Sequence, residues 1–400
     1  MNVAPINLAP QEPGTSHTEV SPILKNKFSQ LHYPTGLSII AGVLESAGVE
    51  FKTYDTYTFN SHEEVLRCLV EDNCDILMTF GYLGNYTYSF FKRYFGLIKQ
   101  RLPQCRIVVG GPIASTIPEH LIKYAHVDIA VIGEGEETTI DLVDTLGKGR
   151  DLAAVKGIAF RKQNKMQLTE PRRRLADLDA WLLPDLNRFN AAPYIDFLKR
   201  TNRCWELVAS RGCYGKCTFC RRVFGSKITR ISPPRAFELM HQVYTKFGLT
   251  RFSFVDDNFL SNTSQAEGFA NVLQAQDMDY QWRFQARVDA ISPEIIQRLS
   301  SLGLFDVSFG VESGSDKMLK SYRKKITSEE IIRVLSNVKK HVDIHATFIV
   351  GGPGEDWSTV EETAELIRRL ELNNAGVGIL TPSPDTEIYE EALKKRHYPQ

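Results

Sequence analysis

The sequence predicts an α/β protein with an open parallel sheet in its first domain and an incomplete barrel of six βα units in its second. Short apolar runs alternate with amphipathic helical patterns over residues 1–150, lose that rhythm over 151–203, and regain it over 204–400. Strands that alternate with helices form parallel sheets covered by helices. A length of 400 residues also indicates two or three domains, at about 150 residues each. We therefore expect domains at 1–150 and 204–400, joined by a linker and hairpin at 151–203.

Composition excludes several classes of protein. Hydrophobic residues make up 42% and charged residues 24% of the chain, as in ordinary globular domains. The 48 basic and 48 acidic side chains cancel, and without a basic excess or stripe we expect no nucleic-acid partner. The first 25 residues lack the pattern of a secretory signal, and no run of 18 apolar residues could span a membrane. Seven cysteines, an odd number, argue against a disulfide framework and indicate a reducing, cytoplasmic location.

The first domain has five predicted strands, each a short apolar run. They cover residues 3–8, 51–54, 76–80, 106–109 and 129–132. Apolar residues recur with helical spacing between them, as in 37–44 and 91–102. This pattern predicts a flavodoxin- or Rossmann-like sheet covered on both faces. Such sheets bind ligands beyond the carboxyl ends of their strands. Two glycine-containing turns, 110–112 and 133–136, are expected at that edge. The alternative is that they are only tight turns before helices.

Residues 151–203 carry basic residues and prolines rather than the strand–helix rhythm. We interpret this segment as a small hairpin followed by a linker. The run Arg172-Arg173-Arg174 is interpreted as a solvated surface, with a grip on phosphate as the alternative.

The second domain has six predicted strands, each followed by a helix. The strands cover 204–209, 252–255, 282–285, 307–310, 346–350 and 376–380, and the helices 234–247, 265–274, 293–302, 328–341, 358–370 and 386–394. A complete βα barrel has eight such units, so six predict a partial (β/α)6 barrel that is open at one side. Reacting groups of βα barrels lie on the loops at the carboxyl ends of the strands.

Three cysteines follow the first of these strands with the spacing C-x3-C-x2-C: Cys213, Cys217 and Cys220. Three thiolates on one loop can hold three irons of a cubane cluster and leave the fourth iron open. A structural zinc site is the alternative, but it needs a fourth ligand. Cys204 is poorly placed inside the first predicted strand, and no histidine lies between it and His241. The spacing therefore favours an iron–sulfur cluster.

The cysteine motif, with Phe219 before its third cysteine, resembles that of the radical S-adenosylmethionine (SAM) superfamily. The segments 255–259, 310–314 and 349–355, which end the second, fourth and fifth predicted strands, resemble the same family. The first domain resembles the cobalamin-binding domain that precedes the barrel in one large subgroup, and 178–185 resembles its linker. The resemblance covers nearly the whole chain. Two departures are Tyr214, where relatives often have proline, and Ile113, where many have histidine.

The resemblance implies that Cys213, Cys217 and Cys220 ligate a [4Fe–4S] cluster whose open iron binds SAM. It implies reductive cleavage of SAM to methionine and a 5′-deoxyadenosyl radical, with electrons from a reductant protein such as flavodoxin or ferredoxin. The SAM-binding residues it implies are Phe219, Asp256, Asp257, Glu312, Ser313, Lys324 and Gly351. A carboxylate at a strand end can pair with the methionine ammonium, although acids and glycines there also serve as caps and turns.

The resemblance also implies cobalamin in the first domain. The residues it implies are Thr79, Phe80, Gly110, Gly111, Pro112, Gly133, Glu134, Gly135 and Glu136. The string D-x-H-x-x-G, which supplies a histidine to cobalt in some relatives, is absent from the sequence. We therefore expect cobalamin without a histidine ligand on its lower face.

The leading prediction is a cobalamin-dependent radical SAM methyltransferase that acts on an unactivated carbon of a small biosynthetic substrate. A second hypothesis is a radical SAM enzyme for cyclisation, rearrangement or oxidation, with cobalamin non-methylating or absent. A third is a non-catalytic module with a structural zinc or a redox-sensing cluster. A methylthio-transferring enzyme is disfavoured, since Cys68, Cys74 and Cys105 do not fall where a second cluster would need them. The chain ends about twenty residues after its sixth predicted strand, so we expect either a minimal member or a truncated one.

Overall fold

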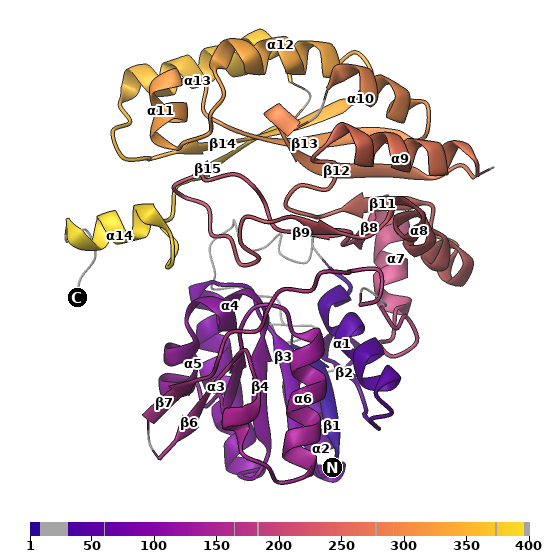
Figure 1. Cartoon of the computed structure of the whole chain (residues 1–400), viewed down its shortest axis with the longest axis vertical. Helices are drawn as coiled ribbons and strands as arrows, with labels where there is room; N and C mark the ends of the chain where they lie inside the picture. The colour runs from indigo at the N-terminus through magenta and orange to yellow at the C-terminus, as the bar shows by residue number, and fades with distance from the viewer. Residues whose placement is uncertain are drawn as a thin grey trace. The chain divides into compact units, whose positions relative to one another are not determined.

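The computed structural model describes residues 1–8, 31–59, 61–163, 165–181, 184–276, 278–290, 292–372 and 374–395. The chain divides into two compact units (Figure 1). The first comprises Met1–Ala176 and Ala180–Asn202, and the second comprises Asp177–Asp179 and Arg203–Gln400. No helix in the described residues is long and apolar enough to cross a membrane.

The first unit is built on a seven-stranded sheet of order β2-β1-β3-β4-β5-β6-β7. Its parallel part consists of β1 Val3–Asn7, β2 Tyr54–Asp55, β3 Ile76–Phe80, β4 Arg106–Gly110 and β5 Ile129–Val131. The predicted hairpin forms as β6 Ile158–Lys162 and β7 Lys165–Leu168, and β6 pairs antiparallel with β5. The five parallel strands and the hairpin are confirmed, but the hairpin extends the sheet instead of lying apart from it.

Helices cover both faces of this sheet, as the sequence predicts. On one face, Leu44 of α1 (Thr35–Ser46) and Leu142 of α6 (Glu136–Gly147) pack with Val3, Met78 and Val108. The other face carries α2 His62–Glu71, α3 Asn85–Arg101, α4 Gly111–Thr116 and α5 Pro118–Tyr124. Successive residues of a strand point to opposite faces of the sheet. Because successive residues of these strands are apolar, the sheet packs against helices on both of its faces.

A buried polar cluster lies at the carboxyl ends of β1 and β2. Asp55 is 3% exposed and accepts hydrogen bonds from Tyr194 Oη (2.6 Å) and Asn7 Nδ2 (3.1 Å). Tyr194 comes from α7 (Ala192–Thr201), a helix in the segment that was predicted to be a linker without one. Burial raises the pKa of Asp55 to about 6. Residues 182–183 of the predicted linker segment lie outside the described residues.

We expect Asp55→Asn to remove a pH dependence of stability from the first unit. Because burial raises the folded-state pKa above its unfolded value, the folded state binds the proton more tightly. The free energy of unfolding then falls as pH rises from about 4 to about 6, by roughly 3 kcal/mol at 1.36 kcal/mol per pKa unit, and is flat above. Denaturant unfolding at about pH 4.5 and pH 7.5 measures this. Exposed Asp196→Asn, on the same helix as Tyr194, is the control; an Asp55→Asn slope equal to wild type would contradict the expectation.

The second unit is an open sheet of six parallel strands, of order β15-β14-β13-β12-β11-β8. The strands are β8 Trp205–Leu207, β11 Arg251–Phe254, β12 Gln281–Arg287, β13 Leu304–Glu312, β14 Asp343–Val350 and β15 Asn374–Ile379. In the described part of the chain β8 and β15 are the two edges and do not pair with each other. The six predicted strands and the partial barrel are confirmed.

Six helices follow these strands where the sequence predicts them. They are α8 Pro233–Phe247, α9 Thr263–Gln274, α10 Pro293–Ser300, α12 Ser328–Val338, α13 Trp357–Leu370 and α14 Glu387–Lys394. A short helix, α11 Asp316–Ser321, was not predicted. Within β12, Trp282, Phe284 and Ala286 are buried, and the Trp282 ring contacts Phe269 of α9. The alternate side chains, including Arg283 and Arg287, therefore lie on the opposite face of the strand.

Candidate functional site

The three cysteines of the motif lie on a loop closed by a two-stranded ladder. Strand β9 Ser210–Arg211 pairs antiparallel with β10 Thr229–Arg230, and the loop 212–228 runs between them. This loop leaves the carboxyl end of β8, where βα barrels carry their reacting groups. Cys204 precedes β8, at the opposite end of that strand. The structure thus separates Cys204 from the motif cysteines.

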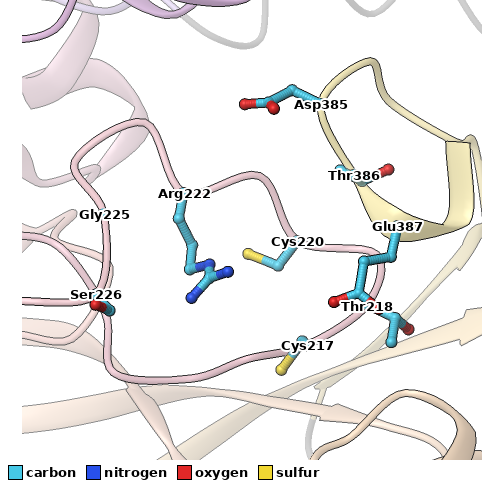
Figure 2. Close-up of a pocket in the computed structure, with 9 residues that line it drawn as sticks. All are labelled: Cys217, Thr218, Cys220, Arg222, Gly225, Ser226, Asp385, Thr386 and Glu387. Carbon is cyan, nitrogen blue, oxygen red and sulfur yellow. The ribbon is translucent and has the colours of Figure 1, made fainter. Parts of the chain in front are cut away.

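A cavity of about 330 Å³ opens beside the cysteine loop (Figure 2). Its lining residues are Cys217, Thr218, Cys220, Arg222, Gly225, Ser226, Asp385, Thr386 and Glu387. The last three come from the start of α14 and the turn before it, and Arg222 extends from the loop beside the two thiols (Figure 2). The cavity is therefore polar and lined from two elements of the second unit.

The three motif thiols lie on one loop. Among the described residues, no three histidine, cysteine, aspartate or glutamate side chains are placed to hold one metal ion together. A cubane cluster instead takes one thiolate per iron, and three thiols on a single loop are a donor set of that kind. Burial raises the pKa of the Cys213 thiol, whereas the Gly215 N–H, 3.4 Å from its sulfur, acts in the opposite direction.

Two buried polar side chains lie at the carboxyl end of β11. Asp256 is 3% exposed, and its Oδ1 accepts hydrogen bonds from the Ala209 N–H (2.8 Å) and the Ser210 N–H, which holds the turn that enters the cysteine loop. Burial raises the pKa of Asp256 to about 7. Its Oδ2 and both polar atoms of the buried Asn258 side chain find no hydrogen-bond partner in the described residues. Asp257, by contrast, is exposed.

The residues that end β13 form a buried ion pair and a helix contact. Lys324 Nζ lies 3.1 Å from Glu312 Oε1 and 2.7 Å from the Gly310 carbonyl oxygen. Glu312 adopts a left-handed backbone conformation with φ of 72°. Ser313 is buried, and its hydroxyl lies 3.1 Å from Thr363 Oγ1 of α13. The structure therefore turns Ser313 toward α13, and couples Glu312 to Lys324.

Phe219 packs behind the loop instead of projecting freely. Its ring meets the Tyr322 ring edge-on at 5.3 Å, in a cluster with Met318, Ile349, Leu380 and Ile388. Gly351 has φ of 85°, and its N–H donates to Glu355 Oε2. Glu355 thus holds the turn after β14.

Sequence reasoning missed Arg287, the last residue of β12. The predicted third strand ended at 285, two residues short of the observed end. In the structure the Arg287 guanidinium lies 3.5 Å from Cys217 Sγ and is largely buried. In the sequence, a single arginine after an apolar run indicates only the end of a strand. The contact between Arg287 and Cys217 is visible only in the fold.

In the first unit, both glycine turns lie at the carboxyl edge of the sheet, at the ends of β4 and β5. Thr79 and Phe80 end β3 beside them, and the buried Thr79 Oγ1 finds no hydrogen-bond partner in the described residues. Gly111 has φ of 79°, and a Cβ there would approach the Gly81 carbonyl oxygen to 3.3 Å. Gly110 ends β4 and caps α4, which begins with Gly111 and Pro112, and Gly133 and Gly135 both precede α6.

The acids of the second glycine turn serve the fold. The Glu134 carboxylate accepts a hydrogen bond of 2.7 Å from the Leu175 N–H. Glu136 is buried at the start of α6. Glu134 therefore holds the segment after the hairpin.

Both halves of the chain match known families. Residues 207–367 match the model of the radical SAM superfamily, and residues 22–143 match that of the B12 binding domain. The chain therefore combines the two domain types, in the order that the sequence predicts. It has a radical SAM domain preceded by a B12 binding domain.

Relatives with curated names include methyltransferases and a cyclase. An uncharacterized methyltransferase of Pyrococcus horikoshii is 29% identical over 72% of this chain and 63% of its own. The anaerobic magnesium-protoporphyrin IX monomethyl ester cyclase of Rubrivivax gelatinosus is 26% identical over 75% of this chain and 55% of its own. The chain thus spans less than two thirds of the length of these relatives.

Two solved structures share the fold of nearly the whole chain. The cobalamin-dependent SAM radical enzyme OxsB, with aqua-cobalamin bound, superposes with a TM-score of 0.78 at 18% identity, over 99% of this chain and 56% of its own. The radical SAM methyltransferase TsrM of Kitasatospora setae, with cobalamin and a [4Fe-4S] cluster bound, gives a TM-score of 0.79 at 16% identity, over 98% of this chain and 75% of its own.

Proposed function

We propose that the chain is the catalytic part of a cobalamin-dependent radical SAM methyltransferase that methylates an unactivated carbon of a small molecule. The observation that carries the proposal is the cysteine loop at the carboxyl end of the first barrel strand, beside a polar cavity, on a chain that also has a B12-type sheet domain. Methyltransferases among the relatives support it. The second candidate, a cyclase or other radical enzyme without methyl transfer, is favoured by the similarity to the Rubrivivax enzyme.

The chain's own residues would bind and orient the cofactors. We assign the three motif cysteines as cluster ligands; a bound cluster supplies the electron that cleaves SAM. Asp256 Oδ2 and the two polar atoms of the Asn258 amide are buried without a hydrogen bond in the described residues, and they suit a bound group with both donors and acceptors. Phe219 and Gly351 would border that group, and Asp257, Glu312, Ser313 and Lys324 would shape its surroundings.

We propose that cobalamin binds at the carboxyl edge of the first sheet, against Thr79, Phe80 and the two glycine turns. The buried, unpartnered Thr79 hydroxyl at this edge suits a ligand that carries a hydrogen-bonding group. Cobalamin would supply the methyl group to the substrate. His62 packs against the rings of Phe90 and Tyr94 in the core.

We propose that a small acidic electron carrier, such as flavodoxin or ferredoxin, reduces the cluster in the cytoplasm. The segment 211–230 contains six basic residues and no acid, in a chain with zero net charge. Three of the six, Lys216, Arg222 and Lys227, are exposed. Opposite charge on a partner would steer its approach to the cluster loop. The functional division we propose remains 1–150 for cobalamin, 151–203 as connector and 204–400 for radical chemistry.

Methyl-labelled SAM tests the proposed function. The reconstituted protein, loaded with hydroxocobalamin and reduced with dithionite, is expected to convert SAM and to place label on material that co-elutes with cobalamin. Formation of 5′-deoxyadenosine without any label on cobalamin would favour the second candidate. Protein that leaves SAM intact would exclude both.

A further inference from the structure

We infer that Arg287 is a positioning residue that raises the reduction potential of the cluster through a hydrogen bond to Cys217. The inference rests on the proposed function, because it needs the cluster on the cysteine loop. It assigns a role to a residue outside the motif, on the third strand of the barrel.

The guanidinium of Arg287 is fixed on three sides and points its remaining nitrogen at the loop. Its Nε and Nη2 donate to the two carboxylate oxygens of Asp289 at 2.8 and 2.9 Å. Nη2 also donates to the Lys324 carbonyl oxygen at 2.8 Å. Nη1 lies 3.5 Å from Cys217 Sγ, within reach of a hydrogen bond to sulfur. A planar fork held this way has little freedom to turn aside.

The cysteine loop is shaped around this side chain. A Cβ at residue 215 would lie 2.8 Å from Nη1, so Gly215 leaves the space that the guanidinium occupies. The ring of Tyr214 covers it, with the centroid 5.3 Å from Cζ, as in a cation–π contact. This gives a physical reason for the aromatic residue after the first cysteine, where relatives often have proline. Arg287 itself is only 8% exposed.

Such a contact acts on the redox equilibrium of the loop. A reduced cluster carries one more negative charge than an oxidised one, so a buried cation and an N–H donor at a ligand sulfur stabilise the reduced state more. Hydrogen bonds to the sulfurs and local charge are established determinants of cluster potential. Removing the guanidinium should therefore make the cluster harder to reduce.

A redox titration of the reconstituted wild-type protein and two variants tests this inference. The midpoint potential is read by electron paramagnetic resonance, in the absence of substrate. Arg287→Gln is expected to disfavour reduction about tenfold, equal to about 59 mV for a one-electron couple. Arg287→Lys keeps the charge without the fork and should shift less. Arg283→Gln is the control. Arg283 lies on the same strand and the same face as Arg287, but it pairs with Asp306 at 2.8 Å. The Arg283→Gln variant should therefore keep the wild-type midpoint potential.

The outcomes separate the inference from the proposed function. Full clusters at unchanged potential in both Arg287 variants would overturn the inference and leave the cluster assignment intact. Loss of the cluster from both variants, with Arg283→Gln retaining it, would overturn it too, since Arg287 would then serve only to build the loop. A wild-type protein that assembles no cluster would instead refute the proposed function.

Discussion

Replacing any one of Cys213, Cys217 and Cys220 with alanine is expected to abolish both the cluster and the cleavage of SAM. Each thiolate would hold a different iron, so two remaining ligands cannot retain a four-iron cubane with an open site. Iron per chain should fall from about four to below about one after reconstitution and desalting. Iron and sulfide assays with the visible spectrum measure this, and reduction with dithionite should yield no 5′-deoxyadenosine above background.

Cys204→Ala is the matched control for the motif cysteines. Cys204 is nine residues upstream of the motif and precedes β8, whereas the loop leaves the carboxyl end of that strand. The Cys204→Ala variant should therefore retain iron at the wild-type level. Equal iron loss in Cys204→Ala and Cys217→Ala would contradict the three-ligand assignment and favour a four-cysteine site such as zinc.

Gly352→Ala is expected to destabilise the second unit by about 3 kcal/mol, because the turn after β14 packs directly on a buried ring. A Cβ at residue 352 would overlap Tyr322 Oη and lie 2.8 Å from Cζ and 2.9 Å from Met318 Cε. Tyr322 is fully buried and supports Phe219 behind the cysteine loop. The midpoint of thermal unfolding should fall by roughly 6–12 °C, and cluster retention should fall with it.

A second substitution tests whether the clash is the cause. The Tyr322 hydroxyl has no hydrogen-bond partner in the described residues, so Tyr322→Phe alone should change the unfolding midpoint little. In the double variant, loss of the Tyr322 hydroxyl, which makes the worst contact, should restore roughly half of the stability lost in Gly352→Ala. Additive losses in the double variant would show that Gly352 is needed for another reason.

The strand–helix order was readable from sequence because each element is long enough to show its period. Alternation of apolar and helical stretches located every strand of the partial barrel, and the terminal helix α14 as well. Helix α7 was not predicted, although its buried residues Tyr194, Phe197 and Leu198 have helical spacing. It is ten residues long and follows a proline-bearing segment, which resembles a linker when read locally.

The site was predictable only where its signal is local. The three cysteines share one loop, so their spacing is visible in the sequence. The contact between Arg287 and Cys217 spans 70 residues and depends on how far β12 extends. Ser313 was predicted to bind SAM because of its motif, but the motif did not indicate that its hydroxyl contacts Thr363 on α13. Side-chain direction at a strand end depends on register and twist, which one sequence does not display.

The metal content of the whole protein tests the central claim most directly. We would purify the chain without oxygen, reconstitute it with iron and sulfide, add hydroxocobalamin, desalt it, and measure iron, cobalt and the absorption spectrum. The account predicts about four irons and about one cobalt per chain, with the spectrum of cobalamin that lacks a nitrogenous lower ligand. Zinc in place of iron, in a protein that leaves SAM intact under reduction, would contradict it.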